Sequence, residues 1–290
     1  MFVNRYLWYF IRMTTGIGQQ LKACGRKQLP EVIAAANNHY RLVRIFKHDF
    51  FAATALYEFI GPAKSDHSSV ADLVVLKIGR LSDFFGLPLI CLGEILCEHE
   101  FSILRRLHGF RGTPRLLGRY GKTGLVYEYI AGKSLDEEVE VPDDFFDQLE
   151  ELLSGIHALG IAYVDTNKRG NILLGSDNRA YLIDYQISVH IGRLWRMWFW
   201  PAGYLLRTLQ REDFYHLYKH KRRFRSDLMD EEQLRRSRRI SKWVGLHRAL
   251  TQPLTNLRRR FLGYLYRHNQ LVIDKTIEAH TETDPARWNK

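Results

Sequence analysis

The most informative stretch of this sequence is YVDTNKRGNILLGSDNRAYLIDY, residues Tyr163–Tyr185. It places an acid, Asp165, in an expected loop and an amide, Asn171, six residues later. Two short apolar runs separated by a glycine-containing turn follow, and they predict two strands. The second run delivers another acid, Asp184. Phosphoryl transfer needs this set of groups, because one carboxylate orients an attacking hydroxyl while an amide oxygen and a second carboxylate hold Mg²⁺.

Upstream of this stretch, the sequence predicts a strand followed by a long helix. The run Ala71–Ile78 is β-branched and apolar, as in a buried strand, and it ends near a lone lysine, Lys77. Apolar residues then recur at helical spacing over 87–107. Three carboxylates on this helix, Glu94, Glu98 and Glu100, could face back toward the lysine.

The order of these elements resembles the catalytic core of the protein-kinase-like superfamily, over residues 40–187. Within it, the short core and the missing APE motif are most similar to compact bacterial members, the lipopolysaccharide-core sugar kinases and the RIO-like atypical Ser/Thr kinases. The resemblance implies an α+β, two-lobed protein-kinase-like fold. Its N-lobe would be a small antiparallel sheet with one long helix, and its C-lobe would be mainly helical.

The resemblance also implies a role for each polar residue of the central stretch. Asp165 would orient the acceptor hydroxyl, and Lys168 would offset the charge of the transferring phosphate. Asn171 and Asp184 would bind Mg²⁺.

Upstream residues would complete the ATP site by the same resemblance. Lys77 would contact the α- and β-phosphates, and Glu100 would hold it in place, because the kinase pattern of Glu, two residues, then Ile-Leu fits Glu100 alone of the three carboxylates. The sequence LVYEYIAGKSL resembles the kinase hinge, so the backbone groups of Glu128 and Ile130 would meet the adenine edge. The lone His157, which lies on a helix predicted at 143–159 from apolar spacing and the following Gly160, is assigned a structural role.

Three motifs depart from the kinase pattern. Strands are predicted at Leu42–Phe46 and Ala55–Phe59, and the segment 47–54 between them, KHDFFAAT, holds no glycine where kinases have a glycine-rich phosphate loop. Lys47 or His48 could supply positive charge there, and the alternative is a solvated turn. The interval from Asp165 to Asn171 is one residue longer than usual, and Tyr-Val precedes Asp165 in place of His-Arg, which argues against control by a phosphorylated activation loop. Asp184-Tyr185-Gln186 replaces DFG and favours a site fixed in one state. The alternative function is therefore a pseudokinase, a binding or scaffold module without phosphotransfer.

Composition limits the class of protein and its partners. With 290 residues, 46% hydrophobic and 26% charged, the chain is expected to be globular. A net charge of +11 and a pI near 9.6 call for an anionic partner. The three cysteines are scattered and lack metal-ligand spacing, which favours a reducing, cytoplasmic compartment.

Beyond Ser188 the sequence turns aromatic and basic, beginning with RLWRMWFWPAGYLLRTLQREDFYHLYKHKRRFR at 193–225. Basic residues interleaved with Trp, Leu and Phe suit an interfacial helix among anionic lipid headgroups. The alternative is a helical lobe with a solvated basic face and an aromatic core. A nucleic acid partner is not expected, because nothing resembles a recognition motif.

These observations predict four segments along the chain. They are an aromatic and basic extension at 1–39, an N-lobe at 40–130, a helical C-lobe at 131–273, and a polar tail at 274–290. The first thirteen residues are apolar but too short to span a membrane. We expect an ATP- and Mg²⁺-dependent kinase that acts on a glycolipid sugar or a protein Ser/Thr hydroxyl, in the cytoplasm and peripherally on the inner membrane face.

Overall fold

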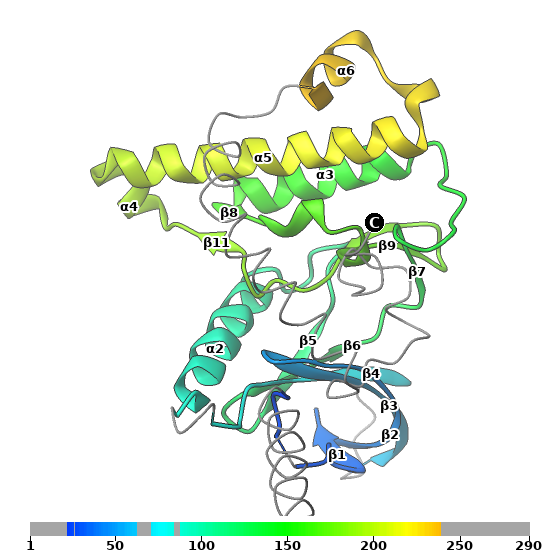
Figure 1. Ribbon diagram of the computed structural model, residues 1–290, viewed down its shortest axis with the longest axis vertical. Helices are drawn as coiled ribbons and strands as arrows, with labels where there is room; N and C mark the ends of the chain where they lie inside the picture. The colour runs from blue at the N-terminus through cyan, green and yellow to red at the C-terminus, as the bar shows by residue number, and fades with distance from the viewer. Residues whose placement is uncertain (1–21, 26, 63–70, 84–87, 239–290) are drawn as a thin grey trace, which may run out of the picture. The chain divides into compact units, whose positions relative to one another are not determined.

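The computed structural model describes residues 22–25, 27–62, 71–83 and 88–238, which form a mixed α+β fold (Figure 1). The described residues divide into two compact units. Those up to Phe101, together with Arg115–Tyr129, form unit 1. Ser102–Pro114 and the described residues from Ile130 onward form unit 2.

Unit 1 is built on a six-stranded antiparallel sheet with the order β1-β2-β3-β4-β6-β5. The helix α2, Ile90–Arg106, begins in this unit and continues into unit 2. The strands are β1 (Val32–Ala35), β2 (Asn38–His48), β3 (Ala52–Pro62), β4 (Leu73–Gly79), β5 (Leu116–Tyr120) and β6 (Gly124–Glu128).

The strand β4 lies between β3 and β6 and is buried along nearly its whole length. Five consecutive residues from Val74 to Ile78 are buried, as expected for a strand covered on both faces. Tyr40, Tyr57 and Val126 from neighbouring strands join the same core cluster. Lys77 is therefore held at a fixed position in a rigid part of the sheet.

In unit 2, two helices lie side by side (Figure 1). These are α3 (Phe145–Ala158) and α5 (Trp200–Phe224). Leu149, Leu153 and Ile156 recur at helical spacing on the buried face of α3. Gly160 follows the helix with φ of 74°, the left-handed conformation that glycine adopts most readily after a helix end.

Short elements complete unit 2 around these two helices. A three-stranded sheet has the order β10-β9-β7, and a two-stranded one pairs β11 with β8. The remaining elements are β7 (Gly132–Ser134), β8 (Ile161–Ala162), β9 (Ile172–Gly175), β10 (Ala180–Leu182), β11 (Val189–His190), α4 (Arg193–Trp198) and α6 (Glu231–Arg238), with single 3₁₀ turns η1 (Asp165–Asn167), η2 (Arg169–Asn171) and η3 (Ser226–Leu228).

Most predicted elements appear, with shifted ends. The sheet starts earlier than the sequence indicated, because β1 and the start of β2 lie within the segment expected to be an extension. The expected N-terminal aromatic segment, the basic segment after 238 and the polar tail lie outside the described residues. Within the described part of the chain, no helix is both long and apolar enough to cross a membrane.

Candidate active site

The central stretch folds into a loop and a hairpin that bring four predicted residues together in unit 2. Asn171 Nδ2 donates a hydrogen bond to Asp165 Oδ2 at 2.7 Å. Lys168 Nζ lies 3.8 Å from Asp165 Oδ2 and 3.9 Å from Asp184 Oδ2, and so bridges the two carboxylates. The side chain of Asp165 is 22% exposed and that of Asp184 31%, so both are accessible to a ligand.

The β9–β10 hairpin explains how residues thirteen positions apart become neighbours. Ile172 pairs with Leu182 at the open end of the hairpin, and the Ile183 amide donates to the Asn171 carbonyl at 3.0 Å. Asn171 therefore enters the hairpin beside the point where Asp184 leaves it. The chain from Asp165 to Asn171 forms two consecutive 3₁₀ turns, η1 and η2.

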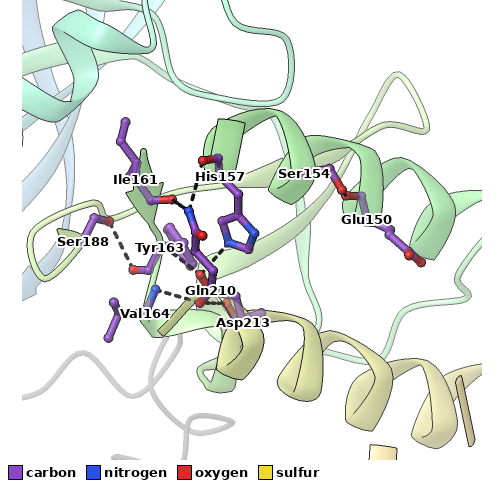
Figure 2. Close-up of polar contacts among 10 residues, drawn as sticks. Glu150, Ser154, His157, Ile161, Tyr163, Val164, Ser188, Gln210 and Asp213 are labelled. Carbon is purple, nitrogen blue, oxygen red and sulfur yellow. Dashed lines mark hydrogen bonds and ion pairs between the residues drawn. The ribbon is translucent and has the colours of Figure 1, made fainter. Parts of the chain in front are cut away.

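A buried carboxylate that sequence reasoning did not identify, Asp213 on α5, holds the start of this loop (Figure 2). Its Oδ1 accepts hydrogen bonds from the Val164 amide and the Thr166 hydroxyl, both at 2.8 Å. Its Oδ2 accepts from the Tyr163 amide at 2.8 Å and lies 2.9 Å from His157 Nε2. Asp213 is thus a positioning residue, and His157 has the structural role expected of it.

The backbone held by Asp213 is strained. Val164 has φ of 72°, in the left-handed region that a β-branched residue rarely adopts. Such a conformation costs on the order of 1–3 kcal/mol and persists only where surrounding contacts over-determine it. The hydrogen bonds to Asp213 on both sides of Val164 are those contacts. They turn the chain sharply just before Asp165.

A sequence signal for Asp213 exists in the spacing of α5. Leu206, Asp213 and Leu217 fall on the same buried face of the helix. A carboxylate on an apolar face must find hydrogen-bond donors, because burying it without them is costly. The position of Asp213 on this face could therefore have indicated an anchor, although not what it anchors.

A buried tyrosine pair fixes the other end of the site. The Tyr163 hydroxyl donates a hydrogen bond to the Ile183 carbonyl, directly before Asp184. The rings of Tyr163 and Tyr185 meet edge to face with centroids 5.1 Å apart. Burial, reinforced by Tyr185 and the nearby carboxylates, raises the pKa of the Tyr163 phenol well above its usual value, so it stays a donor. Tyr185, the middle residue of Asp184-Tyr185-Gln186, is a fully buried core residue.

Unit 1 holds the other predicted pair. Lys77 Nζ lies 3.0 Å from Glu100 Oε1 and 2.8 Å from Oε2, and both side chains are buried. Of the competing carboxylates, Glu98 is exposed and pairs with Arg119 instead. A buried ion pair adds little net stability, because the desolvation of both charges offsets their attraction. The burial of this pair therefore favours a functional role over a stabilising one.

The two residues predicted to meet adenine lie at a unit boundary. Glu128 ends β6, and its amide donates to the Arg115 carbonyl at 2.9 Å. Its carboxylate pairs with Arg115 Nε at 2.9 Å. Ile130 is two residues further along, in unit 2, and is partly buried.

The turn between β2 and β3 contains no glycine, and hydrogen bonds to the side chain of Asp49 hold its backbone. Asp49 Oδ1 accepts hydrogen bonds from the amides of Phe51 and Ala52, both at 2.9 Å. Asp49 Oδ2 lies 2.7 Å from Lys47 Nζ. The amides that a glycine-rich loop would offer to phosphates are therefore already engaged here.

His48 does not add a positive charge to this turn. Its Nε2 accepts a hydrogen bond from the Cys24 amide at 3.2 Å, which requires that nitrogen to be unprotonated. Burial and the charge of Lys22 lower the pKa of the His48 imidazole. His48 is therefore neutral at pH 7.

The donor set in unit 2 consists of carboxylate and amide oxygens, which are the ligands that Mg²⁺ prefers. The described residues contain no group of three or more His, Cys, Asp or Glu side chains that could hold a metal. Mg²⁺ is bound by one or two carboxylates, with waters and substrate phosphates as its other ligands. Because the Asn171 amide nitrogen donates to Asp165, its oxygen Oδ1 is the atom on offer to a metal beside Asp184.

Comparison with known proteins gives no relative: no protein-family model and no curated protein matches this chain.

Proposed function

We propose that this chain is a Mg²⁺- and ATP-dependent kinase with a two-lobed protein-kinase-like fold, which transfers the γ-phosphate to a hydroxyl group. The observation that carries the proposal is the cluster of Asp165, Lys168, Asn171 and Asp184 around the β9–β10 hairpin. The buried Lys77–Glu100 pair of unit 1 supports it independently.

In this proposal the residues of unit 2 act mainly by positioning and electrostatics. Asp165 accepts a hydrogen bond from the acceptor hydroxyl and takes its proton as the new oxygen–phosphorus bond forms and the bond to the β-phosphate oxygen breaks. Lys168 offsets the charge of the transferring phosphate. Asn171 Oδ1 and Asp184 would hold Mg²⁺, which when bound neutralises phosphate charge.

Residues of unit 1, together with Ile130 of unit 2, would bind ATP. Lys77, oriented by Glu100, contacts the α- and β-phosphates, and the backbone of Glu128 and Ile130 meets the adenine edge. The acceptor is either a lipopolysaccharide-core-type sugar or a protein Ser/Thr. We propose that the reaction takes place in the cytoplasm or at the inner membrane face. The free cysteines Cys24, Cys91 and Cys97 are consistent with a reducing compartment.

The decisive experiment measures transfer of radiolabelled phosphate from ATP with Mg²⁺, to total protein and to extracted glycolipid. The parent chain is compared with Asp165→Ala, Asp184→Asn and Lys77→Met. The matched control is Glu151→Gln, a substitution of an exposed carboxylate on α3. Transfer by the parent and by the control, with loss in the three variants, supports the proposal and identifies the acceptor class. Equal transfer by the Asp165→Ala variant would refute it.

The competing candidate is a pseudokinase, and the acid-closed turn at Asp49 favours it. In this turn the backbone amides of Phe51 and Ala52 already donate hydrogen bonds to the Asp49 carboxylate, whereas the amides of a kinase phosphate loop are free to bind phosphates. Calorimetric titration with Mg²⁺-ATP separates the two candidates. Absence of both binding and transfer would support a scaffold, whereas binding with transfer would show that the remaining groups suffice to hold the phosphates.

A further inference from the structure

Unit 2 exposes a run of large apolar side chains on α4 and the first turns of α5. We call it the aromatic patch, and its members are Leu194 (71% exposed), Trp195 (67%), Trp198 (87%), Phe199 (51%), Trp200 (77%), Tyr204 (47%) and Leu205 (52%). In Figure 1, α4 folds back beside the N-terminal end of α5, so the patch occupies one end of this helix pair. Exposed apolar residues are usually scattered singly, and a contiguous group of this kind marks an interaction site.

The patch is a structured surface. Trp195 and Phe199, one helical turn apart, meet edge to face with centroids 6.2 Å apart. Gly203 packs closely against the backbone of Arg196, which holds α4 against α5. Leu206 is buried on the opposite side of α5. The helices therefore display the rings outward from a fixed support.

The segment that carries the patch has charges of one sign. From Tyr185 to Arg211 the sequence contains no Asp or Glu. Arg193, Arg207 and Arg211 are exposed. An acid-free segment with exposed arginines is complementary to an anionic partner.

We propose that the aromatic patch docks the protein onto an anionic lipid bilayer. Tryptophan and tyrosine rings favour the membrane–water interface, where an apolar ring is buried while its polar atom stays hydrated. Arginines beside them pair with anionic headgroups. This combination fits a bilayer interface better than a pocket on a protein partner. Three tryptophans within six residues project from the surface, and a protein partner would need a groove shaped to fit them, whereas a bilayer interface would not. The inference does not depend on phosphotransfer.

The test is flotation of the full chain, without ATP, on vesicles of phosphatidylcholine containing phosphatidylglycerol and on vesicles of phosphatidylcholine alone. The parent is expected to float with the anionic vesicles. The Trp198→Ala/Trp200→Ala variant removes two of the most exposed rings, so it should partition at least about tenfold less, while its melting temperature stays that of the parent. Asp165→Ala should float like the parent, so a failed kinase proposal would leave this result unchanged.

A second pair of variants separates local charge from net charge. Arg193→Gln/Arg207→Gln/Arg211→Gln should lose the preference for anionic vesicles. Its matched control is Arg105→Gln/Arg106→Gln/Arg111→Gln, which neutralises three exposed arginines at and just after the end of α2 and should leave flotation unchanged.

Three results would overturn the proposal. The first is that the parent does not float with anionic vesicles. The second is that the parent and the tryptophan variant float equally. The third is that the parent forms a dimer that the tryptophan variant does not form, while neither protein binds vesicles. The last would assign the patch to contact between two copies of the chain. Sedimentation velocity of both proteins measures it.

Discussion

At the scale of single residues, Asp213 decides the shape of the loop that carries Asp165, although it is not itself one of the clustered site residues. One carboxylate satisfies two backbone amides, a hydroxyl and an imidazole. Hydrogen bonds to a charged acceptor contribute about 1.5–3 kcal/mol each. Several such bonds on one side chain can outweigh the strain at Val164.

The substitution Asp213→Asn tests this role. An asparagine nitrogen cannot accept a hydrogen bond, so either the Tyr163 or the Val164 amide loses its acceptor whichever way the side-chain amide turns. We expect a loss of about 1–3 kcal/mol in the free energy of unfolding, measured by urea denaturation. Phosphotransfer should fall between about ten- and a hundredfold, because Asp165 is displaced. Parent-like values for both, as expected for the control Glu151→Gln, would show that Asp213 does not position the loop.

We expect His220 on α5 to make the stability of the folded chain depend on pH. His220 is buried with Nε2 3.0 Å from the Thr166 carbonyl. Burial lowers the pKa of its imidazole from 6.5 to about 4, with the charges of Lys219, Arg169 and Arg223 acting in the same direction. Between these two pH values the unfolded chain binds more protons than the folded one, so stability is full above pH 6.5 and falls as the pH drops toward 4.

We therefore expect His220→Gln, whose amide can still donate to the Thr166 carbonyl, to flatten this pH dependence. The difference in unfolding free energy between the parent and variant should change by up to about 3 kcal/mol between pH 7 and pH 4. Urea denaturation across this range measures it. A difference that stays constant with pH would mean that His220 does not titrate in this window.

At the scale of elements, the packing of α2 on the chain after β4 sets the distance between Glu100 and Lys77. Gly93 lies in α2 against Arg80, and a Cβ atom there would come within 2.2 Å of the Arg80 carbonyl oxygen and 2.9 Å of its amide nitrogen. Both neighbours are backbone, so the helix itself would have to move.

The substitution Gly93→Ala should therefore destabilise unit 1 by about 1–3 kcal/mol, despite the better helix propensity of alanine. It should also weaken ATP binding by loosening the Lys77–Glu100 pair. Cys91→Ala is the control, because Cys91 is exposed on the same helix and its replacement should be neutral. Thermal melting and ATP titration of both variants measure these effects. Stabilisation by Gly93→Ala would contradict the close backbone contact.

Elements were more predictable from the sequence than the contacts between them. The helix expected at 143–159 is found at Phe145–Ala158, because apolar spacing and Gly160 define it locally. The clustering of Asp165, Asn171 and Asp184 followed from a local hairpin. The strands β2 and β3 extend further than predicted, since Lys47 and His48 pair across to Thr54 and Ala53.

Two features were missed because they depend on distant or specific hydrogen bonds. Asp213 reaches residues about fifty positions earlier, a link that helical periodicity cannot supply. The turn between β2 and β3 is closed because Asp49 accepts hydrogen bonds from two following backbone amides. The prediction for this segment depended on the absence of glycine and on Lys47 and His48, and it did not include the Asp49 side chain. Local sequence patterns determine where helices and strands form, whereas hydrogen bonds of polar side chains determine how the loops between them are positioned.

At the scale of the whole molecule, the net charge of +11 acts on every anionic partner alike. It should give weak, sequence-independent binding to duplex DNA at low salt, which falls steeply as salt rises because counterion release drives it. Binding to anionic vesicles through the aromatic patch should behave differently, since the burial of rings does not depend on screening. The salt dependence of the two partners therefore distinguishes charge from recognition.

We expect DNA binding, followed by fluorescence anisotropy of a labelled duplex, to vanish as ionic strength rises from about 0.1 to 1 M and the Debye length shortens from about 10 to 3 Å. Flotation of the parent on anionic vesicles should decline much less over the same series. In the Trp198→Ala/Trp200→Ala variant, binding to DNA and binding to anionic vesicles should fall with salt in the same way, because only charge attraction holds this variant to either partner. If binding of the parent to DNA and to anionic vesicles already falls with salt in the same way, vesicle binding depends on net charge alone. The exposed tryptophans would then not contribute to membrane binding.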